Sequence, residues 1–167
     1  LVWFKVRDER YRRLLILGVP YITIGIGSLM WIYHIVSFHI LCFVFMIWAT
    51  DTGGYIVGKS VKGPKLAPKI SPNKTWSGLL GGMVFSGFVC WGYAFLFGNN
   101  DWRFAVAGAL LAVIEQVGDL IESAIKRHLG IKDSSSLIPG HGGVFDRIDG
   151  MIFTAPFVYL ILAYWFI

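Results

Sequence analysis

The sequence predicts an all-α fold, a polytopic bundle of about five transmembrane helices, and three observations support this prediction. Hydrophobic residues make up 56% of the 167 residues and charged residues only 15%, whereas soluble domains carry about 25% charged residues. The mean hydropathy is +0.64. The apolar residues also gather in runs close to the ~20 residues that a helix needs to cross a bilayer. No linker or low-complexity stretch divides the chain, so we expect residues 1–167 to form a single membrane-embedded domain.

Five apolar runs are the expected spans, and they cover residues 14–33, 35–50, 76–97, 102–118 and 150–167. The second and fourth runs are short for a bilayer unless flanking turns extend them. The fourth continues without a break into a polar-faced helix, whose expected end is Gly130 because glycine is common at helix C-termini. In the third run, Gly78, Gly82 and Ser86 recur every four residues. This spacing lets helices approach closely, so we interpret the three as packing residues.

The basic residues are distributed unevenly between the two sides of the predicted bundle. Alternating spans place the N-terminal segment, the lysine-rich loop 51–75 and the polar segment 118–149 on one side, and all three are basic. The turns on the other side carry one arginine, Arg103. Because basic loops stay on the cytoplasmic side of a membrane, we expect this basic side to be cytoplasmic. The net charge of +5 is explained by basic residues that orient the chain in the membrane and by binding of anionic substrates or lipids. Nucleic acid is a poor candidate for a partner.

The segment 118–149 stands out because it concentrates polar groups in an apolar chain. It holds half of the ten carboxylates. If its first part is a helix that begins a few residues earlier, one face of that helix, within roughly 100° of arc, carries Glu115, Asp119, Glu122, Ser123 and Lys126. Residues 139–143, PGHGG, suit a loop whose bare N–H groups can cradle an anion. The alternative for any one of these residues is a solvated loop with ion pairs.

The same segment resembles the signature of a known enzyme family. Its parts are Ser123-Ala-Ile-Lys126-Arg127, Lys132-Asp133 and Pro139-Gly140-His141-Gly142-Gly143-Val-Phe-Asp146-Arg147-Ile-Asp149. This long pattern is similar to that of the phosphatidate cytidylyltransferases, the CDP-diacylglycerol synthases, and the resemblance extends back to about Asp51. It implies a catalytic domain that transfers a cytidylyl group from CTP to phosphatidic acid, giving CDP-diacylglycerol and pyrophosphate for phospholipid biosynthesis.

The resemblance also implies where such an enzyme works. We expect an integral protein of a bacterial inner membrane, with its active site facing the cytoplasm and with further chain N-terminal to residue 1. Its partners would be CTP, phosphatidic acid and the lipid bilayer, and a homodimer is left open.

Two further stretches resemble family motifs. Asp51-Thr-Gly-Gly-Tyr55 is similar to an Asp-Thr-Gly-small-Tyr motif at the cytoplasmic end of the second span. A carboxylate there opposes the helix dipole, so Asp51 is expected to have a cation or the active site as its partner. Ile70-Ser-Pro-Asn-Lys-Thr75 resembles the second motif, and Pro72 predicts that the third span begins there. The sequence departs from the family pattern at Ser77, near which an acidic residue is common, and at Ser135, where glycine is frequent.

The resemblance assigns roles to individual residues. The expected catalytic residues are Asp119, Lys126, Arg127, Asp146 and Arg147. The expected substrate-binding residues are Asp51, Ser71, Lys74, Thr75, Lys132, Asp133, His141 and Gly142. The expected metal ligands are Asp119, Asp146 and Asp149, with Glu122 as nearby support. The cofactor is expected to be Mg²⁺, with a second, monovalent cation such as K⁺ left open.

The chemistry explains why these residue types are needed. A phosphomonoester has its second pKa at about 6, so phosphatidic acid is itself the nucleophile near pH 7 and no Ser, Cys or His nucleophile is required. Two mutually repelling phosphates must instead be neutralised and held in line. Mg²⁺ takes oxygen ligands, Arg binds phosphate with its fork and Lys binds it as a point charge.

The sequence argues against three other functions. Residues 53–60 fit GxxxxGK[ST], but a P-loop needs a strand before it, and here a membrane-length helix precedes it. A transporter or channel would place charges near the middle of its spans, whereas these gather at the ends. An enzyme that consumes CDP-diacylglycerol would carry a DGxxAR-type motif, which is not found. The two cysteines, Cys42 and Cys90, lie in apolar runs and are interpreted as packing residues.

Overall fold

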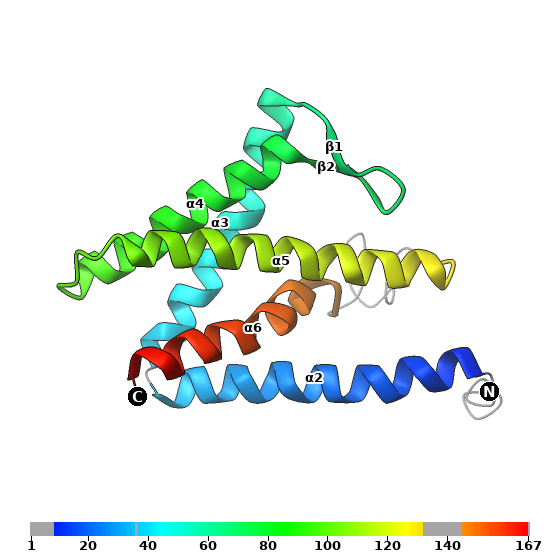
Figure 1. The fold of residues 1–167 in the computed structure, drawn as a ribbon, viewed down its shortest axis with the longest axis horizontal. Helices are drawn as coiled ribbons and strands as arrows, with labels where there is room; N and C mark the ends of the chain where they lie inside the picture. Colours follow the sequence, from blue (N-terminus) through cyan, green and yellow to red (C-terminus); the bar gives the residue numbers. More distant parts are fainter. Residues whose placement is uncertain (1–8, 36, 132–144, 167) are drawn as a thin grey trace.

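The computed structural model describes residues 9–35, 37–131 and 145–166, and within them it contains five long helices and one β-hairpin (Figure 1). The elements are α2 (Glu9–Ile35), α3 (Ser37–Val61), β1 (Lys65–Ala67), β2 (Ser71–Thr75), α4 (Trp76–Leu96), α5 (Arg103–His128) and α6 (Phe145–Phe166). The helices α2 to α5 are long and apolar enough to cross a membrane, and α6 contributes a shorter apolar stretch, Ile148–Tyr164. The predicted all-α transmembrane bundle is therefore confirmed.

The helices alternate in direction, as five consecutive spans require. In Figure 1 the α2–α3 turn, the α4–α5 turn and the C-terminal end of α6 gather at one end of the molecule. The N-terminal end of α2 and the C-terminal end of α5 lie at the opposite end. The helix α5 ends at His128, and Gly130 follows with φ +72°, so the predicted stop at this glycine is correct.

The second span is longer than the sequence predicted. The apolar run ends at residue 50, but α3 continues through Asp51 and three glycines to Val61. These glycines do not end the helix because they form its contact with α4: a Cβ at Gly53 would lie 2.8 Å from the Gly81 carbonyl oxygen. Small residues that allow close helix contact are favoured inside membranes, and this packing overrides the low helix propensity of glycine.

The third span begins at Trp76, where the apolar run begins, and not at Pro72 as the proline suggested. Ser71–Thr75 forms β2, which pairs antiparallel with β1 in the register Lys65↔Thr75 and Ala67↔Ser71. Pro72 therefore lies in a two-stranded hairpin, where a missing N–H is tolerated at an edge, and does not begin a helix. The cap of α4 is Thr75, whose Oγ1 accepts a hydrogen bond from Gly78 N at 3.1 Å.

The predicted packing role of the small residues in α4 is correct. A Cβ at Gly78 would lie 2.8 Å from the Gly54 carbonyl oxygen, and one at Gly82 would lie 3.0 Å from that of Thr50. The Ser86 hydroxyl donates a hydrogen bond of 2.6 Å to the Gly108 carbonyl of α5. The α4 backbone is thus in close contact with α3 on one side and α5 on the other.

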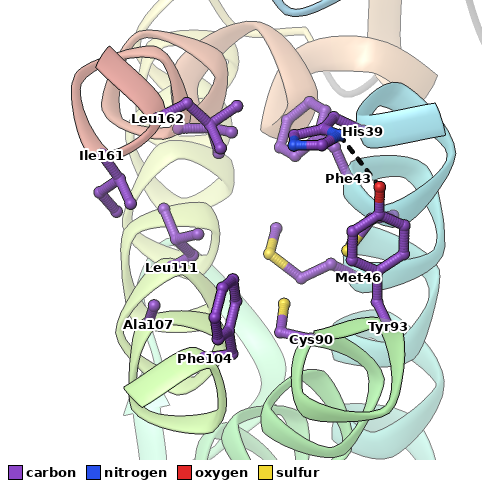
Figure 2. Close-up of a pocket in the computed structure, with 12 residues that line it drawn as sticks. His39, Phe43, Met46, Cys90, Tyr93, Phe104, Ala107, Leu111, Ile161 and Leu162 are labelled. Atoms are coloured by element: carbon purple, nitrogen blue, oxygen red, sulfur yellow. Dashed lines mark hydrogen bonds between the residues drawn. The ribbon is translucent and has the colours of Figure 1, made fainter. Parts of the chain in front are cut away.

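The core lies where α2, α3, α4, α5 and α6 converge, and its buried members are Ile32, Phe43, Met46, Ile47, Cys90, Leu111, Ala155 and Val158. A cavity of about 90 Å³ adjoins this core (Figure 2). His39 Nδ1 and Tyr93 Oη lie 3.0 Å apart at its wall. Cys42 and Cys90 also line the cavity as free thiols, which agrees with their interpretation as packing residues.

Candidate active site

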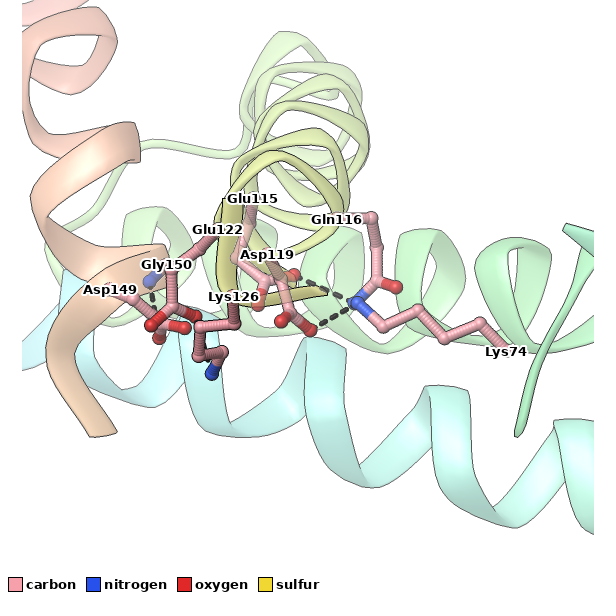
Figure 3. Close-up of polar contacts among 8 residues, drawn as sticks. All are labelled: Lys74, Glu115, Gln116, Asp119, Glu122, Lys126, Asp149 and Gly150. Carbon is pink, nitrogen blue, oxygen red and sulfur yellow. Dashed lines mark hydrogen bonds and ion pairs between the residues drawn. The ribbon is translucent and has the colours of Figure 1, made fainter. Parts of the chain in front are cut away.

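Three carboxylates from two helices converge where α6 begins against α5. Asp119 and Glu122 lie on α5, Asp149 lies in the first turns of α6, and each offers an oxygen within 4.8 Å of the others (Figure 3). The spacing of three residues places Asp119 and Glu122 on the same face of α5. Because like charges at this separation repel, a shared proton or a bound cation would stabilise the cluster.

Of the three carboxylates, Glu122 is the most buried, so its charge most needs a partner. Its side chain is almost buried, with 9% of the residue exposed, and neither carboxylate oxygen accepts a hydrogen bond of ordinary geometry from the described residues. Lys126, one turn later, places Nζ 3.1 Å from Glu122 Oε2. A buried carboxylate is costly unless it is paired and hydrogen-bonded, so one ammonium group leaves the oxygens of Glu122 with capacity for further ligands.

Lys74 brings the β-hairpin into this site. Its ammonium group forms an ion pair and a hydrogen bond with Asp119 Oδ2, and both side chains are largely shielded from solvent. The sequence had placed Lys74 inside the positive N-terminal turn of a helix. In the structure it lies in β2, two residues before Trp76 begins α4, and its charge is balanced by Asp119.

Two close contacts fix the position of Asp149. A Cβ at Gly118 of α5 would lie 2.6 Å from the Phe153 ring, and one at Gly25 of α2 would lie 2.4 Å from Ile152 Cγ2. The start of α6 is therefore held tightly between α2 and α5. The Tyr21 hydroxyl adds a long hydrogen bond of 3.4 Å to the Asp149 carbonyl oxygen.

Glu115 is a buried carboxylate to which sequence reasoning gave no role. It is 3% exposed and accepts a hydrogen bond of 2.9 Å from Gln116 Nε2. A Cβ at Gly150 would lie 3.0 Å from Glu115 Oε1, so glycine is what lets the first turns of α6 rest on this carboxylate. Asp51 and Lys74 both lie within electrostatic range of it. The signal in the sequence was an acidic residue inside an apolar run, four residues before Asp119 and on the same helix face.

The cluster has the donor set that a hard divalent cation prefers. Mg²⁺ binds carboxylate, water and phosphate oxygens, usually with one or two protein carboxylates. Asp119, Glu122 and Asp149 supply such oxygens within one small volume, and Glu122 has oxygens with unmet bonding capacity. These residues therefore fit a Mg²⁺ ion.

The structure brings together part of the predicted site. Lys74, Asp119, Lys126 and Asp149 converge with Glu122, as Figure 3 shows. Asp51 is on α3, about ten residues before its end and not at the end of the span as predicted. The other predicted residues with described side chains are Ser71 in β2, half-buried; Thr75, buried as the cap of α4; and Arg127, exposed near the end of α5.

Some predicted residues cannot be placed relative to the cluster. Asp146 and Arg147 belong to the first turn of α6, but their side chains are outside the described part of the structure. Lys132, Asp133, His141 and Gly142 lie outside the described residues altogether. The roles that the sequence assigned to all of these residues stay predictions.

The P-loop look-alike is a helix in the structure. Residues 53–60 lie wholly inside α3, so their N–H groups are committed to helical hydrogen bonds and cannot cradle a phosphate. Lys59 turns back along the helix and donates a hydrogen bond of 3.1 Å to Tyr55 Oη. The rejection of a P-loop is therefore correct.

Comparisons with known proteins all point to one family. Residues 3–165 match the cytidylyltransferase family. The chain is 45% identical over 128 residues to a phosphatidate cytidylyltransferase of Brucella suis biovar 1, covering 74% of this chain and 47% of that protein. It is 40% identical over 152 residues to a phosphatidate cytidylyltransferase of Staphylococcus haemolyticus, covering 88% of this chain and 57% of that protein. The chain thus spans about half the length of these curated relatives.

Proposed function

Because this chain belongs to the cytidylyltransferase family, we propose that it carries the catalytic part of a phosphatidate cytidylyltransferase. The enzyme transfers a cytidylyl group from CTP to phosphatidic acid, giving CDP-diacylglycerol and pyrophosphate. The observation that carries this proposal is the cluster of Asp119, Glu122 and Asp149, paired with two lysines, within a bundle of membrane-length helices. A lipid substrate and a triphosphate can both reach such a site at a membrane surface.

The reaction is a displacement at the α-phosphorus of CTP. An oxygen of the phosphatidic acid phosphomonoester forms a bond to this phosphorus, and the bond from the phosphorus to the bridging oxygen of the β-phosphate breaks. The nucleophile is already anionic near neutral pH, so the side chains need not remove a proton from it. Their task is to bring two polyanions together and to balance the charge that develops on the pyrophosphate.

The lysines of the site fit this task. Lys74 and Lys126 are held by Asp119 and Glu122, which fixes their ammonium groups at the cluster. From these positions they present point charges to phosphate oxygens. The sequence assigns Arg127, Lys132 and Arg147 to the same anionic substrates.

Asp119, Glu122 and Asp149 are the residues that would hold Mg²⁺, and Asp146 is a further ligand assigned from the sequence. When bound, Mg²⁺ neutralises phosphate oxygens and stabilises the departing pyrophosphate as a Lewis acid. A second, monovalent cation such as K⁺ near the same carboxylates is part of the proposal. Glu115 and Gly150 act indirectly, because their contact keeps the first turns of α6, and so Asp149, against α5.

We further propose that the protein lies in a bacterial inner membrane with this site facing the cytoplasm, where CTP is found. The bacterial relatives and the basic residues on one side of the chain support this orientation. A homodimer stays a prediction, which the mass of the detergent-solubilised protein would test.

The direct test is pyrophosphate release by the purified protein in detergent with CTP, Mg²⁺ and phosphatidic acid. We expect release only when CTP and phosphatidic acid are both present, together with a lipid product that carries the cytidine label. Omitting the lipid is the matched control. Equal release with and without phosphatidic acid would contradict the proposal, because it would show hydrolysis of CTP and not transfer to a lipid.

A further inference from the structure

The last turns of α3 and the segment that joins α3 to α4 carry a concentrated positive charge. Residues 52–75 contain five lysines and no acidic residue. Lys74 pairs with Asp119. The other four form what we call the lysine platform: Lys59, Lys62, Lys65 and Lys69. All four are exposed, and none has an acidic partner among the residues that the structure describes.

Large apolar side chains are exposed beside these lysines. The exposed fractions are 66% for Tyr55, 46% for Ile56, 69% for Val61 and 52% for Trp76. Lys59 lies over the Tyr55 ring, with Nζ 5.3 Å from the ring centroid. Aromatic rings mixed with lysines are typical of the interface between bilayer and water, where the ring enters the headgroup layer and the lysine extends toward water.

The length of α3 is sufficient to carry the platform to the level of the lipid headgroups. Its 25 residues extend about 37 Å at 1.5 Å per residue, whereas the hydrocarbon core of a bilayer is ~30 Å thick. A helix of this length can therefore carry its last turns beyond the hydrocarbon. In Figure 1 the end of α3 and the hairpin project away from α2 and α6, so these helices do not cover the platform.

The backbone that carries the platform is held in place. The Ser77 hydroxyl donates a hydrogen bond to the Lys62 carbonyl, and Trp76 N donates one of 3.1 Å to the Pro64 carbonyl. Lys62 and Gly63 adopt positive φ angles of 60° and 113°, which turn the chain sharply from α3 into β1. The lysines are thus presented by the end of α3, a fixed turn and the hairpin, and binding need not order the backbone first.

We propose that the lysine platform and its exposed apolar neighbours bind the headgroups of anionic phospholipids in the surrounding bilayer. The positive charge complements the headgroup phosphates, and the apolar side chains fit the membrane interface beneath them. A soluble anionic partner would match the lysines but would leave Ile56, Val61 and Trp76 unexplained. This inference needs the membrane insertion of the chain but does not depend on the reaction.

The test measures lipid selectivity directly. The whole chain is reconstituted in phosphatidylcholine vesicles with a trace of spin-labelled phosphatidylglycerol or spin-labelled phosphatidylcholine. Electron spin resonance then gives the fraction of each label that is immobilised at the protein surface. Phosphatidylglycerol has no phosphomonoester, so it reports binding and not the proposed reaction. We expect a preference on the order of fivefold for the anionic label at low salt, falling toward none in 0.5 M salt because of screening (~4 Å Debye length).

Two sets of variants locate the preference. The fourfold change Lys59→Gln, Lys62→Gln, Lys65→Gln and Lys69→Gln should remove most of it. The same four positions changed to Arg keep the charge and should keep the preference. An unchanged preference in the glutamine variant would overturn the proposal, and so would equal immobilisation of the two lipids by the unsubstituted protein at low salt, a result that does not require any variant to fold.

Discussion

Asp119 is the residue at which the two halves of the site meet, because it belongs to the carboxylate cluster and also binds Lys74 of the hairpin. The two residues are 45 positions apart in the sequence. Their pairing depends on β2, a strand that the apolar pattern did not reveal, so the sequence indicated both residues but not their contact. Glu115 was placed on the polar face but given no role for a related reason: the sequence does not reveal its contact with Gly150.

Asp119→Asn should lower turnover at least ~100-fold, the scale seen when an electrostatic partner of the transition state is lost. The protein should still fold, because the change removes one of three mutually repelling carboxylates. The measurement is pyrophosphate release from CTP with phosphatidic acid. Asp101→Asn, at the α4–α5 turn beside Arg103, is the control and should retain activity. Near-normal turnover in Asp119→Asn would remove this carboxylate from the mechanism.

Lys74→Ala should raise the KM for CTP or abolish turnover, since it removes a positive charge that is fixed at the cluster. It also leaves Asp119 without its ion pair. The control is Arg103→Ala, which removes an exposed charge at the N-terminal end of α5, away from Asp119. Steady-state kinetics at varied CTP concentration separate a change in KM from a change in turnover. Equal kinetic constants for the two variants would show that Lys74 contributes only general charge.

At the scale of single elements, the sequence predicted where apolar helices lie better than where they end. The glycines at positions 53, 54 and 58 looked like a loop, yet they are inside α3 because α4 packs directly on them. Pro72 looked like a helix start but lies in β2. Both errors have one cause, since local propensity was overridden by a contact between segments that the sequence alone does not pair.

The contact between α3 and α4 can be tested by adding one methyl group. A Cβ at Gly78 would lie 2.8 Å from the Gly54 carbonyl oxygen, so Gly78→Ala must shift the backbone of one helix. We expect a loss of about 1–3 kcal/mol in the free energy of unfolding, as for other overpacked sites. Gly92→Ala on the same helix meets no atom within 4 Å and is the matched control. Thermal unfolding in detergent measures both, and equal midpoints would contradict this account of the packing.

For the whole molecule, the alternation of the helices predicts that the hairpin and the α4–α5 turn lie on opposite sides of the membrane. Cysteines introduced at Lys65 and at Asn99, both exposed, should react with a membrane-impermeant maleimide from different sides of intact cells and inverted vesicles. We expect Lys65→Cys to react from the cytoplasmic side. The unsubstituted protein, with Cys42 half-buried and Cys90 buried, gives the background. Labelling of both positions from one side would contradict the topology.

The claim on which the account most depends is that Asp119, Glu122 and Asp149 together hold a divalent cation. Mn²⁺ is a paramagnetic substitute for Mg²⁺, and its electron spin resonance signal distinguishes free from bound ion in the purified, detergent-solubilised chain. We predict a Mn²⁺ site from which Mg²⁺ displaces the ion, and at least about tenfold weaker binding in Asp119→Asn, Glu122→Gln and Asp149→Asn, with Asp101→Asn unchanged. Binding of equal strength in the three variants and the unsubstituted protein would contradict the claim.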